Sequence, residues 1–136
     1  MALMNAAPHT VLIVDDDSTL RGALESVLAT MGYRVRSAAD PDGAYALLAA
    51  DPVDAVLLDI RLPTMSGLAL YLAIMHRWPA LEGRIAVMSG DADADDVRPW
   101  LEAHPCPVFR KPFRFELLAG WLSAVLRTRD QESSAG

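Results

Sequence analysis

Several reactive side chains of this sequence stand directly after short apolar runs. The run Val11–Val14 is followed by three consecutive acids, and the run Ala55–Leu58 ends at Asp59. Short, wholly apolar runs that end abruptly at polar residues are typical of strands buried on both faces of a parallel sheet. Ligands bind such sheets beyond the carboxyl ends of the strands. We therefore expect one cluster of polar side chains at that edge, formed by Asp15, Asp16, Asp59, Ser89 and Lys111.

These residue types suit phosphoryl transfer. Neighbouring carboxylates repel one another, so the cluster needs a cation, and oxygen ligands favour a hard ion such as Mg²⁺. An ion held by Asp16 and Asp59 would neutralise charge while the Asp59 carboxylate attacks phosphorus and forms an acyl phosphate. The Lys111 ammonium and the Ser89 hydroxyl would contact two further phosphoryl oxygens. The loose transition state of phosphoryl transfer asks mainly for such positioning and charge neutralisation.

The elements that must position these side chains alternate along the chain. The apolar patterns predict strands at residues 11–14, 33–38, 55–58, 85–88 and 108–110. Helices are expected from an N-cap at Ser18 to a stop at Gly32, after the cap and proline pair Asp40 and Pro41, from Gly67 to Trp78, within 91–104, and along 117–126. This alternation predicts an α/β fold in which helices cover both faces of a doubly wound, parallel sheet.

Size and composition restrict the class of protein. The 136 residues, 52% hydrophobic and 22% charged, fit one globular domain. We place that domain at residues 10–128, between a flexible N-terminus, 1–9, and a disordered polar tail, 129–136. The net charge of −6 disfavours nucleic-acid binding, and no apolar run is long enough to span a membrane. The single cysteine, Cys106, and the lack of a signal-peptide pattern favour the cytoplasm.

The residues around the expected strand ends resemble those of response regulator receiver domains, the phosphoacceptor domains of two-component systems. The matching segments are Val11–Asp17, Leu57–Pro63 with Gly67, Val87–Gly90 and Arg110–Phe113. Each motif is modest alone, but their order and spacing are jointly specific, and the resemblance covers about residues 10–128. It implies the flavodoxin-like (βα)5 fold of the family, with five parallel strands and five helices. It also implies a cis peptide bond between Lys111 and Pro112.

The resemblance implies a role for each candidate residue. Asp59 would be the phosphoacceptor, Ser89 the hydroxyl that contacts the phosphoryl group, and Lys111 the lysine that senses it. The metal ion of the family, Mg²⁺ or Mn²⁺, would be held by Asp16, Asp59 and the backbone carbonyl of Arg61, with Asp15 acting through a water molecule.

The resemblance further implies a signalling function rather than that of an enzyme, beyond assistance to the domain's own phosphorylation and dephosphorylation. The phosphoryl donor would be a histidine kinase or a histidine phosphotransfer protein, and the phosphorylated domain would bind a downstream protein of unknown identity. No direct contact with nucleic acid or membrane is expected. Because no output domain follows Thr128, we expect a stand-alone receiver or one excised from a hybrid kinase.

Two positions depart from the family pattern. The aromatic residue that usually stands three residues before the lysine is replaced by Val108, and Phe109 should point to the opposite face of its strand. Pro99 falls where the fourth helix should run, so that helix should be short or displaced. We therefore expect phosphorylation to alter mainly Gly90 to His104, with little change at the Val108 side chain.

Two other functions compete with this interpretation. A phosphatase of the haloacid dehalogenase type also uses an Asp nucleophile, but it needs a second Asp two residues later, where this chain has Arg61. A receiver-like interaction module that is never phosphorylated would lack one of Asp59, Asp16 and Lys111, and all three are present. Asp17 is interpreted as a helix cap outside the metal site.

Overall fold

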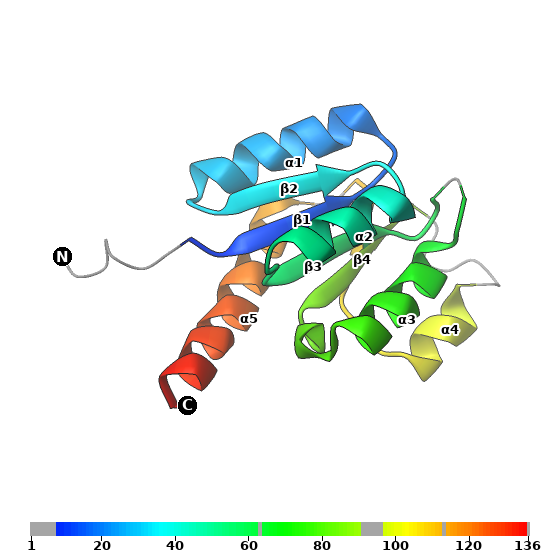
Figure 1. The fold of residues 1–136 in the computed structure, drawn as a ribbon. Coiled ribbons are helices and arrows are strands. Elements are labelled where there is room, and N and C mark those ends of the chain that lie inside the picture. The colour runs from blue at the N-terminus through cyan, green and yellow to red at the C-terminus, as the bar shows by residue number, and fades with distance from the viewer. Residues whose placement is uncertain (1–7, 63, 91–96, 113, 136) are drawn as a thin grey trace.

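The computed structural model describes residues 8–62, 64–90, 97–112 and 114–135, the last eight of these by backbone alone. One sheet contains five parallel strands in the order β2-β1-β3-β4-β5 (Figure 1). The strands are β1 (Thr10–Val14), β2 (Arg34–Ala38), β3 (Ala55–Asp59), β4 (Ile85–Ser89) and β5 (Val108–Arg110). The helices are α1 (Ser18–Thr30), α2 (Pro41–Ala50), α3 (Gly67–Arg77), α4 (Arg98–Ala103) and α5 (Phe115–Ala135), with a 3₁₀ turn at Pro79–Leu81. The predicted fold class is confirmed.

Helices cover both faces of the sheet, as Figure 1 shows. Successive side chains of a strand point to opposite faces, so Leu12 and Val14 belong to one apolar cluster while Val11 and Ile13 belong to the other. The first cluster includes residues of α2, α3 and α4, and the second includes residues of α1 and α5. Burial on both faces is the physical reason why the central strands are apolar throughout.

The start of α1 differs by one residue from the prediction. Asp17, and not Ser18, is the N-cap, because its carboxylate accepts hydrogen bonds from the backbone N–H groups of Thr19 and Leu20 at 3.0 and 3.2 Å. The interpretation of Asp17 as a cap is therefore confirmed. Gly32, with a φ of 96°, follows the C-cap in the left-handed region that ends many helices.

The fourth helix is short, as Pro99 predicted. Pro99 lies in the first turn of α4, where its missing N–H leaves no intrahelical bond unmade. The helix ends at Ala103, and the backbone N–H of His104 donates to the carbonyl of Trp100 at 2.8 Å. Residues 91–96, which belong to the segment expected to respond to phosphorylation, lie outside the described residues.

Disorder was expected at both ends of the chain. A disordered tail was expected at 129–136, and in the structure the backbone of α5 is helical to Ala135. Residues 127–135 contain no Gly or Pro, so the sequence there has no residue that would end a helix. Most of the N-terminal segment, 1–7, lies outside the described residues. No helix in the described ranges is both long and apolar enough to cross a membrane.

The last strand places neighbouring side chains on opposite faces. Val108 packs in the cluster of α2, α3 and α4, whereas Phe109 contacts Trp121 of α5, with 6.0 Å between ring centroids. The prediction that Phe109 points away from the Val108 face is confirmed. The peptide bond between Lys111 and Pro112 is cis, also as expected.

Gly67 allows α3 to begin directly against the end of β3. A Cβ atom built on Gly67 would overlap the carbonyl oxygen of Asp59, and the Gly67 N–H donates to the carbonyl of Ile60 at 2.8 Å. A residue without a side chain is therefore required where the backbone passes this close to Asp59. By contrast, a Cβ atom on Gly120 of α5 would meet nothing within 4 Å.

We expect Gly67→Ala to lower the free energy of unfolding by roughly 1–3 kcal/mol, because the new methyl group displaces backbone next to Asp59. Gly120→Ala is the matched control and should instead stabilise the exposed helix by about 0.5–1 kcal/mol. Urea unfolding followed by circular dichroism measures both changes. Equal midpoints for the Gly67→Ala and wild-type proteins would contradict the steric argument.

Candidate functional site

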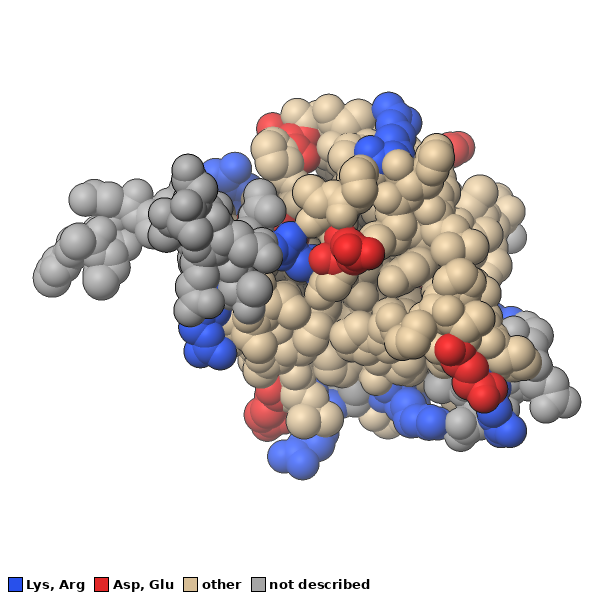
Figure 2. All heavy atoms as spheres, turned by 90° about the horizontal axis from the view of Figure 1, so that it is seen from below, with Lys and Arg blue, Asp and Glu red and all other residues tan. Residues whose placement is uncertain are grey.

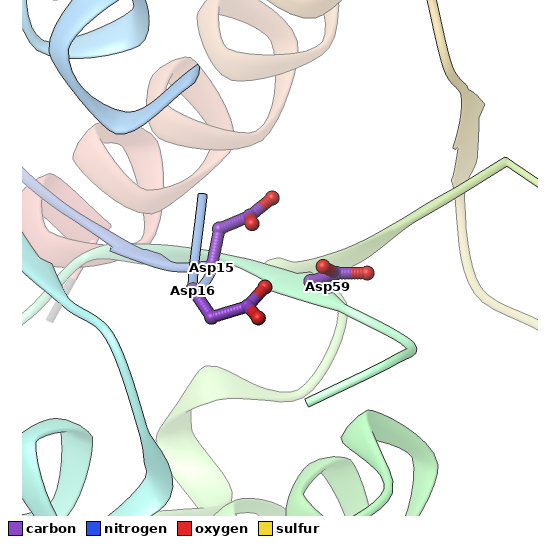
Figure 3. Close-up of side chains that lie close together, drawn as sticks. All are labelled: Asp15, Asp16 and Asp59. Atoms are coloured by element: carbon purple, nitrogen blue, oxygen red, sulfur yellow. The ribbon is translucent and has the colours of Figure 1, made fainter. Parts of the chain in front are cut away.

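Three carboxylates meet where the two central strands end. β1 and β3 are hydrogen-bonded neighbours, with Val14 opposite Leu58, so the residues that follow β1 lie beside Asp59 at the end of β3. One carboxylate oxygen from each of Asp15, Asp16 and Asp59 lies within 4.8 Å of the others. Figure 3 shows the three carboxyl groups extending to the same side of the strand ends. The predicted acidic cluster is thus present at the predicted edge.

Lys111 joins this cluster from the far edge of the sheet. Its Nζ lies 2.9 Å from Asp15 Oδ2 and 3.3 Å from Asp59 Oδ2, so it donates to both carboxylates. Its backbone N–H donates to the carbonyl of Ser89 at 2.7 Å, which fixes the end of β5 beside the end of β4. Ser89 itself is buried at the last position of β4. The structure therefore brings all the strand-end residues to one edge.

Asp15 is fully buried and each of its oxygen atoms accepts a hydrogen bond. The backbone N–H of Asp17 donates to Oδ1 at 2.9 Å, Lys111 donates to Oδ2, and Arg21 Nη1 donates to the main-chain oxygen at 2.7 Å. A buried charge is tolerable only with such partners. Asp15 is therefore a fixed part of the wall of the site.

Asp59 is held by donors on both carboxylate oxygens. The backbone N–H of Arg61 donates to Oδ1 at 3.0 Å, and Lys111 lies on the Oδ2 side. Burial raises the pKa of Asp59 above its ordinary value of 3.8, and the charge of Asp15 adds to that rise. The Arg61 N–H and the Lys111 ammonium act in the opposite direction and do not cancel it. The surroundings of Asp59 thus disfavour the charged form of its carboxyl group.

For Lys111, the neighbouring charges outweigh burial in setting the pKa of the ammonium group. Partial burial by itself lowers the pKa of the ammonium, but hydrogen bonds and charge from Asp15 and Asp59 outweigh the burial, so the pKa of Lys111 is raised. Lys111 is therefore protonated at neutral pH and supplies one positive charge among the carboxylates.

The donor set fits a hard divalent ion. All three side chains offer oxygen, and Asp16, unlike Asp15 and Asp59, is exposed, so an ion could be held at the surface of the cluster with part of its water shell retained. Lys111 already bonds two of the three carboxylates, which leaves Asp16 as the acid without that cation. The contribution of the Arg61 carbonyl stays a prediction, since the observed contact of Arg61 with Asp59 is made by its N–H.

Sequence reasoning missed two partners of the cluster. Arg21 was not selected, although its place one turn after the cap residue Asp17 would let a long side chain reach back toward the acids. The backbone N–H of Arg61 was also overlooked, because residue types do not reveal main-chain donors. Both became visible only in the folded chain.

Comparison with known proteins identifies the family of this chain. The family model of the response regulator receiver domain matches residues 11–122. The chain is 32% identical over 140 aligned positions to the response regulator MprA of Mycolicibacterium vanbaalenii, an alignment that covers 95% of this chain and 55% of MprA. The chain thus spans about half the length of the curated relatives it matches.

Solved receiver structures have the same fold. The receiver domain of the TMAO respiratory response regulator TorR superposes with a TM-score of 0.77 at 30% identity, covering 89% of this chain and 98% of that domain. The chemotaxis protein CheY4 of Vibrio cholerae gives a TM-score of 0.77 at 26% identity, covering 88% of this chain and 99% of CheY4. With an acidic cluster and a lysine at the carboxyl edge of such a sheet, the chain belongs to the response regulator receiver domain family of two-component systems.

Proposed function

We propose that this receiver domain accepts a phosphoryl group on Asp59 in a reaction that depends on a divalent metal ion. Receiver domains are phosphoacceptor signalling domains, and response regulators are phosphorylated by histidine kinases. The observation that carries the proposal is the buried Asp59 carboxylate, placed between two other carboxylates and the Lys111 ammonium. Asp59 is the member of the cluster that stands at a strand end and is neither fully enclosed nor fully exposed.

The chemistry follows from the two sides of the Asp59 carboxylate. One carboxylate oxygen forms a bond to phosphorus while the P–N bond of a phosphohistidine breaks, and the electron pair of that bond stays on the imidazole nitrogen. The Arg61 N–H at 3.0 Å orients the carboxylate during this transfer. Because the charge of Asp59 is disfavoured by burial, converting it to an acyl phosphate moves negative charge outward onto phosphoryl oxygens.

A metal ion, Mg²⁺ or Mn²⁺, would be held by Asp16 and Asp59 directly, by the Arg61 carbonyl, and by Asp15 through water. Such an ion supplies positive charge that offsets the carboxylates and the phosphoryl oxygens. The buried position of Asp15, bonded to Lys111 and to the Asp17 N–H, supports the indirect role for Asp15. The exposure of Asp16 supports the direct one.

Lys111 and Ser89 complete the set that would contact the phosphoryl group. Lys111 bonds both Asp15 and Asp59, so its ammonium can keep the bond to Asp15 while it turns from Asp59 toward a phosphoryl oxygen. Ser89 lies at the end of β4, beside the strand that carries Asp59, where a hydroxyl can donate to another phosphoryl oxygen. Both are positioned by the sheet rather than by a mobile loop.

The phosphoryl donor would be a histidine kinase or a histidine phosphotransfer protein, and the phosphorylated domain would bind a downstream protein in the cytoplasm. A hollow beside the site is lined by Asp17, Leu20, Lys111, Pro112 and Phe115, so it offers the donor a surface that is partly apolar and partly charged. The face seen in Figure 2 carries Lys and Arg side chains scattered among Asp and Glu, without a continuous basic patch. Among the described residues on that face, Lys and Arg do not form the kind of basic cluster that direct nucleic-acid binding requires.

Two features bear on how the signal would be read. Val108 is small and β-branched, so it cannot sweep between buried and exposed positions as an aromatic ring can. Trp100 of α4 instead contacts Tyr71 of α3 edge-on, with 5.2 Å between ring centroids. We therefore retain the proposal that phosphorylation acts on the segment from Gly90 to His104, part of which lies outside the described residues. That this receiver has no attached output domain stays a prediction, since the chain spans only about half the length of its relatives.

Incubation with acetyl phosphate and Mg²⁺ should add one phosphoryl group to the wild-type protein, measured by intact-protein mass spectrometry. Asp59→Asn should gain none, and EDTA should prevent the reaction of the wild type because the metal offsets the charge on both reactants. Asp51→Asn removes an exposed acid outside the acidic cluster and should react like the wild type. Phosphorylation of the Asp59→Asn protein would show that another residue is the acceptor.

Substitutions of Asp15 and Asp16 should affect Mg²⁺ affinity and folding stability differently. Asp16→Asn removes a direct ligand, so its loss of Mg²⁺ affinity should exceed the roughly 10–100-fold typical of an outer-shell partner, while the metal-free protein remains as stable as the wild type. Asp15→Asn should lose less affinity but unfold at lower urea, because the Lys111 ammonium loses its nearer partner. Calorimetric titration with Mg²⁺ and urea unfolding give the two quantities. Equal affinity losses would contradict this ranking.

The raised pKa of Asp59 predicts how pH affects stability. The folded chain binds the Asp59 proton more tightly than the unfolded chain, so this group's stabilising contribution is present below the unfolded pKa and is lost as pH rises through the folded pKa. At neutral pH, Asp59→Asn should therefore be more stable than the wild type, and the difference should shrink as the pH falls through the folded pKa and disappear below the ordinary pKa of 3.8.

Urea midpoints of the wild-type and Asp59→Asn proteins across that pH range test this expectation. Glu102→Gln, which removes an exposed charge on α4, is the control, and its midpoints should equal those of the wild type at every pH. Saturating Mg²⁺ should narrow the difference at neutral pH, because an ion that binds only the folded chain stabilises it. An Asp59→Asn protein that is less stable than the wild type at neutral pH would refute the assigned balance of burial and charge.

A further inference from the structure

Arg21 contacts the acidic cluster from outside the set of strand-end residues. It lies in the first turn of α1, is half-buried, and its Nη1 donates to the main-chain oxygen of Asp15 at 2.7 Å. This oxygen belongs to the peptide group that joins Asp15 to Asp16. The orientation of that peptide group determines how the exposed Asp16 side chain leaves the strand end.

The position of Arg21 is unusual for a cation. The amino-terminal turn of a helix carries partial positive charge, so a positive side chain there is disfavoured unless it has another partner. Helical side chains lean toward the amino terminus, which lets Arg21 extend back over the first turn to the β1–α1 loop. The hydrogen bond from Arg21 to Asp15 therefore offsets the unfavourable position of a positive charge near the amino terminus of α1.

The other bonds around Asp15 fix its side chain and not the peptide group that follows it. Asp17 N–H and Lys111 hold the two carboxylate oxygens, and the Asp15 N–H donates to the carbonyl of Ala38 on β2 at 3.1 Å. Among the described residues, Arg21 donates the hydrogen bond that holds the main-chain oxygen of Asp15. We infer that Arg21 is a positioning residue that holds the Asp15–Asp16 peptide so that the Asp16 carboxylate faces Asp59 for metal binding.

This inference rests on the proposed function, since it assumes that the three carboxylates bind a divalent ion. Two effects of Arg21 have opposite signs, and this makes the inference testable. As a charge, the guanidinium repels a cation, so its removal should tighten Mg²⁺ binding. As a positioning group, it acts like an outer-shell partner, whose loss typically weakens metal binding by about 10–100-fold.

Calorimetric titration of the full chain with Mg²⁺ alone, supported by the electron paramagnetic resonance signal of free Mn²⁺, decides between these effects. Arg21→Gln should bind the ion about 10-fold more weakly, near the lower end of the outer-shell range. Arg21→Lys, which keeps the charge and a donor, should recover most of the affinity. Arg34→Gln is the matched control, because it removes the same charge from an exposed position at the start of β2, and its affinity should equal that of the wild type.

Equal or tighter Mg²⁺ binding by Arg21→Gln would overturn the inference, as would an equal loss in Arg34→Gln. A second measurement uses acetyl phosphate: the phosphorylation rate of Arg21→Gln should be reduced at limiting Mg²⁺ and restored at saturating Mg²⁺, since Asp59 is oriented independently by the Arg61 N–H. A reduction that persists at saturation would also overturn it. Failure of the wild type to become phosphorylated would refute the proposed function while leaving the binding series as the test of Arg21.

Discussion

The structure must offset the repulsion among three carboxylates that lie at the ends of two adjacent strands. Asp15 is fully enclosed, Asp59 is nearly so, and Asp16 stands at the surface, all within reach of one ion. Charges brought this close out of water are unfavourable unless partners offset them. Lys111 supplies that offset within the chain, and its bonds to Asp15 and Asp59 tie the far edge of the sheet to the centre.

The strand order explains why these groups meet. In the order β2-β1-β3-β4-β5, the chain runs outward from β1 to β2 and then returns to place β3 on the other side of β1. The carboxyl ends of β1 and β3 therefore lie at the point where the winding reverses, which is where open α/β sheets bind ligands. Gly67 lets α3 start against the Asp59 backbone, so the helix closes over the strand end without displacing the acid.

The same packing divides the aromatic side chains near the site between the two faces of the sheet. Val108 and Trp100 belong to the cluster on the α2–α3–α4 face, whereas Phe109 packs on the α1–α5 face against Trp121. The aromatic side chain of β5, Phe109, thus lies on the opposite face of the sheet from Val108. Trp100 lies on the short helix α4, Arg98–Ala103, whose first turn contains Pro99.

The sequence by itself determined the strands, the helices and the edge where they end, because buried parallel strands must be apolar and their ends must be polar. It also identified Asp15, Asp16, Asp59, Ser89 and Lys111, since each follows an apolar run. Only the tertiary structure decided which of these acids is enclosed, which cation bonds them, and that Arg21 and the Arg61 N–H are partners. Burial and main-chain hydrogen bonds arise from several segments packed together, and no local pattern of residue types encodes them.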